Sequence, residues 1–280
     1  MSSNLTDDEF SSLAKIPKAD LHIHLEGTVD HVLLNELATD AKIDLHTPTI
    51  LQFPNLQPFP VPPPNTKILS EPFSGSFLDF ISLYVKISST LRSAEILTKV
   101  ATRYVESAIK EGVIAADIYV TPTTLIALGL PEEDLWVGLL EAERVVKNRF
   151  NFSIRWIFDI VRNSPLSGSE TLELATRARD RGISVPYIGF AGHEAGFPAA
   201  PFAAVFEQAV SLGFTTLAHA GETAGAKSIE DALLHINPAR IGHGVRAVES
   251  PALLEKLKIT QLPIEVCPWS NVALRVFDET

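Results

Sequence analysis

Residues Lys18-Ala-Asp-Leu-His-Ile-His-Leu-Glu-Gly27 decide the fold class that we expect for this chain. Apolar and polar residues alternate up to a glycine, which is the pattern of a short β-strand. Residues i and i+2 of a strand point to the same face, so His22 and His24 project together from its carboxyl end. Zinc takes histidine nitrogens at about 2.0–2.1 Å. The pair therefore predicts a divalent metal site at the end of a strand.

A unit of one apolar strand-like run and one helical pattern repeats from residue 113 onward. The strand-like runs span residues 113–120, 152–160, 185–191, 214–219, 241–243 and 263–267. A strand followed by a helix, several times over, predicts parallel strands joined by crossover helices. With the strand that carries His22 and His24, the sequence predicts seven strands.

The positions of the reactive residues decide between two folds built from such units, a doubly wound sheet and a (β/α)8 barrel. These residues fall at the carboxyl ends of their strands, and they are His22, His24, Gly192, His219, His243 and Cys267. An open sheet gathers its site at one switch point, whereas a barrel builds its site from the carboxyl ends of many strands. The sequence therefore predicts an α/β fold of the eight-stranded, TIM-type barrel class.

Composition limits the class of protein and its partners. The chain has 280 residues, 46% of them hydrophobic, which is enough for one large α/β domain or two small ones. Together with the barrel pattern of the strands, we expect a single domain over residues 1–280. The net charge of -11 disfavours binding to nucleic acids and anionic membranes, and no apolar run reaches the roughly 20 residues of a membrane span. The one cysteine, Cys267, predicts a reducing, cytoplasmic location. The oligomeric state stays open.

A proline-rich stretch separates the first strand from the repeating units. Prolines crowd residues 53–64, which excludes a helix interior or a central strand there. Helical spacing resumes at about residues 76–91. We expect a lid segment over about residues 45–92, with a plain surface loop as the alternative.

Two further strand ends carry the parts of a hydrolytic site. His219-Ala-Gly-Glu222 ends one strand with a histidine and places a carboxyl in the loop beyond it. Arg240-Ile-Gly-His243-Gly244 ends the next strand with a histidine between glycines. A metal ion can lower the pKa of a bound water from about 15.7 to about 7, and a positioned acid or base adds roughly 10²–10⁴ in rate. Together with the paired histidines of the first strand, these residues predict metal-assisted hydrolysis.

Four segments of the chain carry a family likeness. They are Pro17-Lys-Ala-Asp-Leu-His-Ile-His-Leu-Glu-Gly27, His219-Ala-Gly-Glu222, Arg240-Ile-Gly-His243-Gly244 and Glu265-Val-Cys-Pro-Trp-Ser-Asn271. In this order they resemble the adenosine deaminases of the amidohydrolase superfamily, and the likeness extends from about residue 15 to the last residue. The resemblance implies a zinc-dependent (β/α)8 barrel that converts adenosine, a purine nucleoside, and water to inosine and ammonia.

The resemblance also implies a role for each matching position. His22, His24 and His219 resemble the ligands of one zinc ion. Glu222 resembles the acid that protonates ring nitrogen N1 of the purine. His243 resembles the group that orients and helps to deprotonate the water that attacks C6. An acid that donates at neutral pH needs a raised pKa, which burial would give Glu222.

Three positions resemble substrate contacts. Gly192 matches the glycine whose backbone N–H meets ring nitrogen N3, Glu26 matches an acidic residue near the ribose, and His24 is expected to contact the substrate as well. We expect a single metal ion, because no lysine ends the strand at 185–191, where binuclear amidohydrolases carry a metal-bridging carboxylated lysine.

One feature of the family has no counterpart in this sequence. The family ends its eighth strand with an Asp-Asp pair whose first aspartate binds the metal, and this sequence reaches Thr280 shortly after the seventh predicted strand. We therefore expect a C-terminally truncated barrel without the eighth strand and terminal helices, whose first and seventh strands are unpaired edges. Two alternatives stay open. Glu26 stands where some adenosine-specific members have a shorter aspartate, which keeps an adenine deaminase possible, and the missing strand keeps an inactive family member possible.

Overall fold

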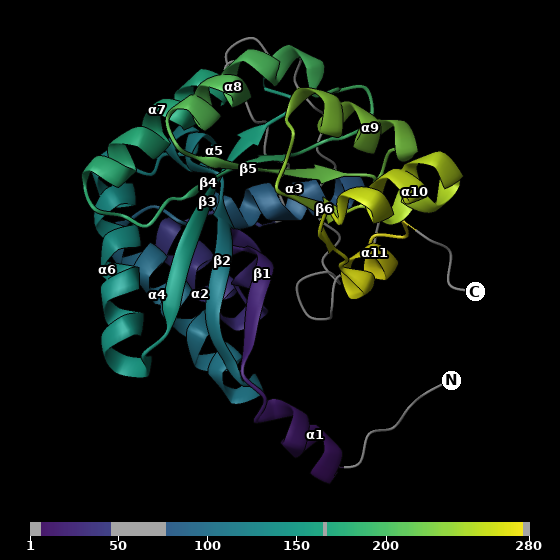
Figure 1. Ribbon diagram of the computed structural model, residues 1–280. Helices are drawn as coiled ribbons and strands as arrows, with labels where there is room; N and C mark the ends of the chain where they lie inside the picture. The colour runs from purple at the N-terminus through teal and green to yellow at the C-terminus, as the bar shows by residue number, and fades with distance from the viewer. Residues whose placement is uncertain (1–6, 46–76, 165–166, 277–280) are drawn as a thin grey trace.

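The strand-like runs of the sequence form strands where the pattern places them. In the computed structural model, which describes residues 7–45, 77–164 and 167–276, seven parallel strands pair in chain order. The strands are β1 (Lys18–His24), β2 (Val113–Val120), β3 (Ser153–Val161), β4 (Tyr187–Ala191), β5 (Thr215–Ala220), β6 (Arg240–His243) and β7 (Ile264–Glu265). Helices that connect the strands, such as those at Glu132–Phe150 and Ser167–Asp180, lie on the outer side of the curved sheet (Figure 1). The predicted TIM-type α/β fold is confirmed.

The two ends of the sheet are β1 and β7, and each pairs with one neighbour among the described residues. The described residues hold no eighth strand, as the sequence predicts. β7 covers only Ile264–Glu265, whereas we predicted a strand over 263–267. The prediction was too long because Pro268 begins the next helix, and proline at the first helical position ends the preceding strand.

Helices alternate with the strands and begin at residues suited to that position. The α-helices are α1 (Asp7–Ala14), α2 (His31–Ala41), α3 (Phe77–Ser88), α4 (Ala94–Ala108), α5 (Pro122–Ala127), α6 (Glu132–Phe150), α7 (Ser167–Asp180), α8 (Ala203–Ser211), α9 (Ala226–His235), α10 (Pro251–Thr260) and α11 (Pro268–Ala273). Short 3-10 helices are η1 (Leu25–Thr28), η3 (Ile109–Glu111), η4 (Ala200–Phe202) and η5 (Val245–Glu249). Asp30 caps α2 and Ser93 caps α4 by accepting backbone N–H groups of the first turn.

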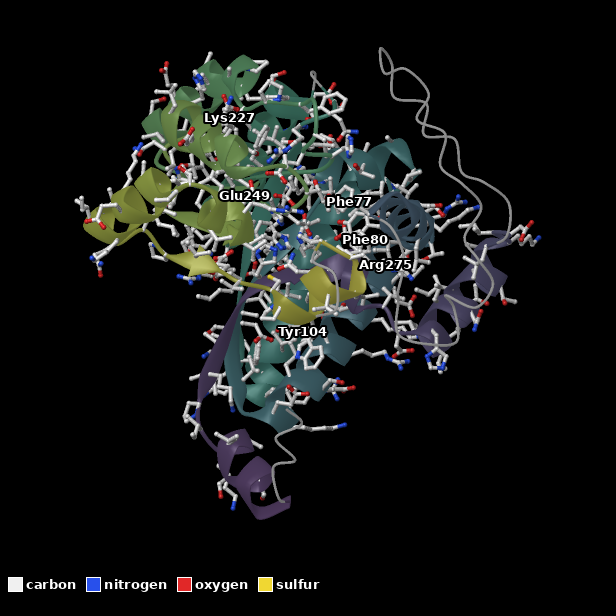
Figure 2. The ribbon with its side chains drawn as sticks, turned by 90° about the vertical axis from the view of Figure 1, so that its right-hand side faces the viewer. Phe77, Phe80, Tyr104, Lys227, Glu249 and Arg275 are labelled. Carbon is white, nitrogen blue, oxygen red and sulfur yellow. The ribbon has the colours of Figure 1, made fainter. Side chains whose placement is uncertain are left out.

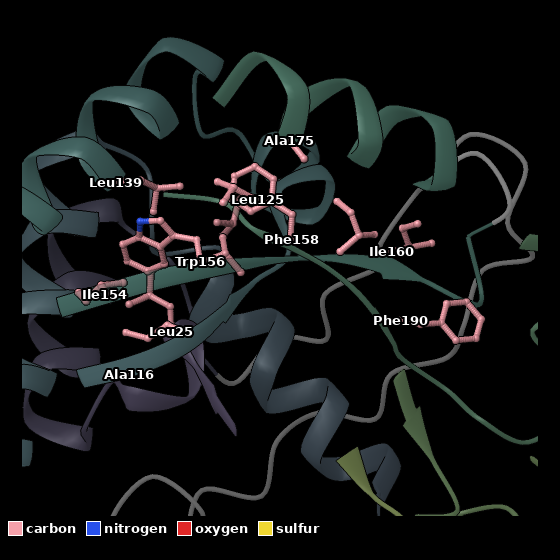
Figure 3. Packing of buried hydrophobic residues seen from close by; sticks show 14 of the residues in the cluster. Leu25, Ala116, Leu125, Leu139, Ile154, Trp156, Phe158, Ile160, Ala175 and Phe190 are labelled. Carbon is pink, nitrogen blue, oxygen red and sulfur yellow. The ribbon is translucent and has the colours of Figure 1, made fainter. Parts of the chain in front are cut away.

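Strands β2 to β5 divide their side chains between two cores. On β3, Trp156, Phe158 and Ile160 are fully buried against the surrounding helices (Figure 3). Ile157 alternates with them and belongs to a separate buried cluster with Tyr119, Tyr187 and Leu217, one residue from each of four strands. Alternate residues of a strand face opposite sides, so this second cluster fills the inside of the sheet.

Local backbone features aim the site residues inward. The pairing of β1 with β2 shifts register between Asp20 and Ile23, which re-aims the strand around His22. On the other side of the sheet, β5 pairs with β6 so that His219 lies opposite Gly242. A Cβ at Gly242 would lie 2.6 Å from Cε1 of His22, so only glycine leaves room for that ring.

The expected lid is described in part. Residues 46–76, which include the proline-rich stretch, lie outside the described residues. The described remainder of the predicted 45–92 segment contains α3, whose Tyr84 ring lies 6.2 Å from the ring of His24. This helix therefore packs at the carboxyl end of β1. Among the described helices, none has the length and apolar character needed to cross a bilayer.

Candidate active site

Four histidines from three strands gather at the carboxyl end of the sheet. His22 and His24 lie on β1, His219 on β5, and His243 ends β6. Nε2 of His24 lies 3.0 Å from Nε2 of His219, a residue 195 positions later in the chain. One ring nitrogen each from His22, His219 and His243 lies within 4.8 Å of the others. The fold thus brings together all the histidines that the sequence singled out for the site.

Buried partners fix how the rings are turned. Nδ1 of His22 lies 2.9 Å from Oε2 of Glu265 on β7, and Arg240 donates a hydrogen bond to the other oxygen of this carboxylate. The ring of His24 stacks on Tyr119 of β2, with 4.7 Å between centroids and 15° between planes. A histidine whose Nδ1 is held by a carboxylate presents its Nε2 to a ligand.

The electrostatics of the cluster keep the imidazoles of His24, His219 and His243 neutral. Burial, followed by the charges of neighbouring histidines, holds the pKa of both His24 and His219 well below 6.5. Burial and His22 lower the pKa of His243 to about 3. A neutral imidazole has a free lone pair, and several such nitrogens at one point form a donor set that suits zinc and its neighbours among the divalent metals.

The distances between ring nitrogens select His22, His219 and His243 as three possible metal ligands. The sequence instead predicts His22, His24 and His219. We favour the second set. Nε2 of His24 faces Nε2 of His219 directly. Both nitrogens of His243 have other neighbours, because Nδ1 lies 3.1 Å from Nδ2 of Asn271 and Nε2 lies 3.5 Å from Oε1 of Glu222.

An acid and a base therefore face each other beside the histidine cluster. Glu222 lies in the loop after β5 and His243 ends β6, and both side chains are buried. Burial and then the charge of Glu194 raise the pKa of Glu222 to about 8, although Arg162 acts in the opposite direction. At neutral pH the pair is thus a protonated carboxyl and an unprotonated imidazole, which can donate and accept a proton respectively.

The loop that carries Glu222 is held by a second carboxylate. Glu194 is buried and accepts hydrogen bonds from four consecutive backbone N–H groups, those of Gly221, Glu222, Thr223 and Ala224. Three of these bonds span 3.1, 2.7 and 2.9 Å, from Glu222, Thr223 and Ala224 respectively. A row of successive N–H groups is a concave anion site. Glu194 thereby fixes the backbone from which the Glu222 side chain extends.

The two other predicted substrate contacts lie at the same end of the sheet. Gly192 follows β4 with a φ of 99°, and a Cβ there would lie 2.7 Å from Oδ1 of Asn163, so the position requires glycine. Glu26 is fully buried in η1, and its Oε1 accepts a hydrogen bond of 3.2 Å from the backbone N–H of Thr121. Burial raises the pKa of this carboxyl. Glu26 therefore joins η1 to the end of β2.

Helix α3 adds aromatic side chains to the site. Phe77 and Phe80 lie on this helix (Figure 2), and the Phe77 ring is 6.0 Å from the ring of His193. Tyr84, one turn further along, has its hydroxyl 3.2 Å from Oγ1 of Thr121. Aromatic rings beside a few polar groups suit a planar heteroaromatic ligand.

Comparison with known proteins agrees with this geometry. A family model described as adenosine deaminase matches residues 17–280. This chain belongs to the adenosine deaminase family. It is therefore a deaminase, an enzyme that hydrolyses a C–N bond, and the resemblance stated from four sequence segments is confirmed.

Relatives within the deaminase family carry two different names. An adenine deaminase from Cupriavidus necator is 33% identical over 269 residues, which cover 95% of this chain and 71% of the relative. An aminodeoxyfutalosine deaminase from Streptomyces avermitilis is 30% identical over 270 residues, covering 96% and 71% respectively. The crystal structure of an adenine deaminase from Arthrobacter aurescens superposes with a TM-score of 0.78 at 27% identity, covering 94% of this chain and 75% of that one. The family is thus shown, while adenosine itself is not singled out as the substrate.

Sequence reasoning missed several residues that shape the deaminase site. They are Tyr119, Asp159, Glu194, Glu265 and Asn271. Glu265 and Asn271 lie in the last of the four quoted segments, and Glu194 lies two positions after Gly192, so nearness to a motif could have drawn attention to them. A surface groove of about 370 Å³ lies elsewhere, between α7 and α8, and none of the predicted site residues lines it.

Proposed function

We propose that this protein catalyses the hydrolytic deamination of a 6-aminopurine, with free adenine as its preferred substrate. One observation carries the proposal. A carboxyl that keeps its proton at neutral pH, Glu222, lies 3.5 Å from the neutral imidazole of His243 beside a cluster of inward-facing histidines. Deamination at C6 needs both an acid and a base at one reacting centre.

We further propose that His22, His24 and His219 hold one zinc ion. The donor set supports this, because neutral imidazole nitrogens converge there and two of them are only 3.0 Å apart. Zinc bound by three protein ligands supplies a Lewis acid that makes a bound water nucleophilic near neutral pH. Glu265 contacts Nδ1 of His22, the nitrogen away from the proposed metal, and so orients the ring.

The protein's own groups would move the protons. Glu222 donates its proton to ring nitrogen N1. The protonated ring withdraws electrons from C6 and makes that carbon more electrophilic. His243 accepts a proton from the attacking water and orients it toward C6. A C–O bond forms at C6, the amino group takes up the proton that His243 accepted, and the C–N bond breaks to release ammonia. The hydroxyl proton left at C6 returns to Glu222, so both groups end in their starting states. Gly192 and His24 are proposed to contact the purine.

Adenine is placed before adenosine for two reasons. Two relatives named adenine deaminase are 33% and 27% identical to this chain. In addition, Glu26, which we expected near a ribose, is fully buried and bonded to the backbone of Thr121. Because no part of Glu26 is exposed, a ribose hydroxyl could reach this carboxyl only if the residues that cover it moved apart. Adenosine is the second candidate, because the matching family model carries the name adenosine deaminase.

The test uses the zinc-loaded chain of residues 1–280 and measures ammonia released from adenine and from adenosine in separate reactions. We expect kcat/KM to be higher for adenine, and Glu222→Gln is the matched inactive control. Faster turnover of adenosine would reverse the order of the two substrates. Stoichiometric zinc without ammonia from either substrate would refute the proposed function and support the reading of an inactive family member.

A further inference from the structure

Asp159 is a buried carboxylate without an assigned task. It lies on β3 between Phe158 and Ile160, which pack outward, so its side chain points into the sheet interior. Its exposed fraction is 1%, and neither carboxylate oxygen has a hydrogen-bond partner among the described residues. Buried charged groups are normally paired or coordinate metals, and an exception in a native structure calls for an explanation.

The group that Asp159 faces is His24. Oδ2 of Asp159 lies 3.8 Å from Nδ1 of His24. The other nitrogen of the same ring, Nε2, lies 3.0 Å from Nε2 of His219. Stacking on Tyr119 holds the plane of the ring. The imidazole thus presents one nitrogen to the histidine cluster and the opposite nitrogen to the carboxylate.

The chemistry of imidazole links these two contacts. A neutral histidine that gives the lone pair of Nε2 to a cation carries its proton on Nδ1. That N–H then needs an acceptor, and a hydrogen bond of this kind spans about 2.7–3.2 Å. The terminal torsion of an aspartate is broad, so rotation of the Asp159 carboxylate is the movement by which we expect the present 3.8 Å separation to shorten. His22 already has the equivalent arrangement, with its Nδ1 2.9 Å from Glu265.

The neighbouring strand leaves the space that Asp159 occupies. Asp159 pairs in register with Gly189 of β4. A Cβ on Gly189 would lie 2.1 Å from Oδ1 of Asp159, a separation that would displace the carboxylate. Gly189 has no positive φ that would by itself require glycine, so the demand for a small residue comes from its neighbours, Asp159 nearest.

We propose that Asp159 is a positioning residue that accepts the Nδ1 proton of His24 and so turns Nε2 toward the metal, and that Gly189 makes room for it. This inference rests on the metal site of the proposed function. It assigns no contact between Asp159 and the metal or the purine. Asp159 acts only through His24, whose ring it holds in the tautomer that binds a cation.

The test measures zinc affinity, which requires no substrate. The full chain is titrated with zinc against a chromophoric chelator, as wild type, Asp159→Ala and Asp159→Asn. We expect Asp159→Ala to bind zinc about 10–100-fold more weakly, the usual effect of removing a carboxylate behind a metal-binding histidine. Asp159→Asn keeps an acceptor oxygen and should lie between the two. Gly189→Ala should weaken zinc binding as well, with a loss that is not additive to that of Asp159→Ala.

Thermal unfolding of the metal-free proteins separates positioning from structural support. Because Asp159 makes no hydrogen bond that truncation could remove, Asp159→Ala should not lower the Tm. The control is Glu143→Ala on α6, whose carboxylate accepts bonds from Trp156 and Ser184. It should lower the Tm and leave zinc affinity unchanged. Zinc affinity of Asp159→Ala within twofold of wild type overturns this inference alone, whereas a wild-type chain that binds no zinc overturns the metal site and this inference together.

Discussion

A rise in pH above neutral should slow catalysis by removing one proton from Glu222. The pKa of this carboxyl is raised from 4.5 to about 8, first by burial and then by Glu194. A group that donates a proton works only while it holds one. With a pKa of about 8, about nine tenths of the molecules carry the proton at pH 7 and about one tenth at pH 9. We therefore predict that kcat/KM falls about tenfold between these two pH values.

The acidic side of the same profile should be flat. His243 has to be unprotonated to accept a proton, and burial together with His22 lowers its pKa to about 3. It therefore stays neutral throughout the range near neutral pH. Between about pH 5 and pH 7, Glu222 carries the proton that it donates and His243 is unprotonated, so kcat/KM should reach a plateau there.

The assay follows ammonia release from adenine at constant zinc occupancy between about pH 5 and pH 9.5. Glu194→Gln removes the charge beside Glu222 and should move the alkaline limb to lower pH, because a neighbouring negative charge is one cause of the raised pKa. Glu143→Gln changes a carboxyl on α6 that contacts Trp156 instead, and it should leave the profile unmoved. A flat profile from pH 7 to pH 9 in an active enzyme would refute Glu222 as the proton donor. An alkaline limb that Glu194→Gln leaves in place would refute the part assigned to Glu194.

Three further outcomes are expected. Glu222→Gln should retain stoichiometric zinc by mass spectrometry and lose roughly 10²–10⁴ in kcat; a loss below about twofold contradicts its role. Between about pH 6.5 and about pH 3, the free energy of unfolding of the metal-free chain, measured in urea, should fall more steeply with falling pH in the wild type than in His243→Gln, because His243 binds its proton in the unfolded chain first; equal slopes in the two proteins contradict the lowered pKa. Trp156→Ala should destabilise the chain by about 3–5 kcal/mol in the same assay, since this side chain is fully buried; a loss below about 1 kcal/mol would contradict its packing.

Hydropathy and motif position were sufficient to locate the strands and the histidines. The run 113–120 corresponds to β2 at both ends, because a strand covered on both faces reads as a continuous apolar segment. The histidines could be predicted because parallel strands bring their carboxyl ends to one side of the sheet, whatever the length of chain between them. His24 and His219 are neighbours for this reason alone.

The groups that support the site could not be predicted in the same way. Alternation along β3 indicates that Asp159 faces inward, but the sequence does not reveal which side chain it meets. That contact depends on the stagger between β1 and β3, which are not neighbours in the sheet. Glu194 lies near Gly192 in the sequence, but its role does not follow from that nearness, because its partners are backbone N–H groups of residues 221–224. Every residue except proline has the same backbone N–H group, so a sequence pattern does not show which of these groups a side chain will contact.

One residue with a left-handed backbone and several buried polar atoms without partners lie together at the site. His243 has a φ of 64°, in the left-handed region where a residue other than glycine costs on the order of 1–3 kcal/mol. Nδ1 of His219 and both oxygens of Asp159 are buried without hydrogen-bond partners among the described residues. Around Trp156, by contrast, the packing is apolar and the indole N–H is bonded. These groups lie where three strands bring imidazoles together. Their location is explained by chemistry, because a site that binds a cation and exchanges protons must keep lone pairs and acidic protons unsatisfied until its ligands arrive.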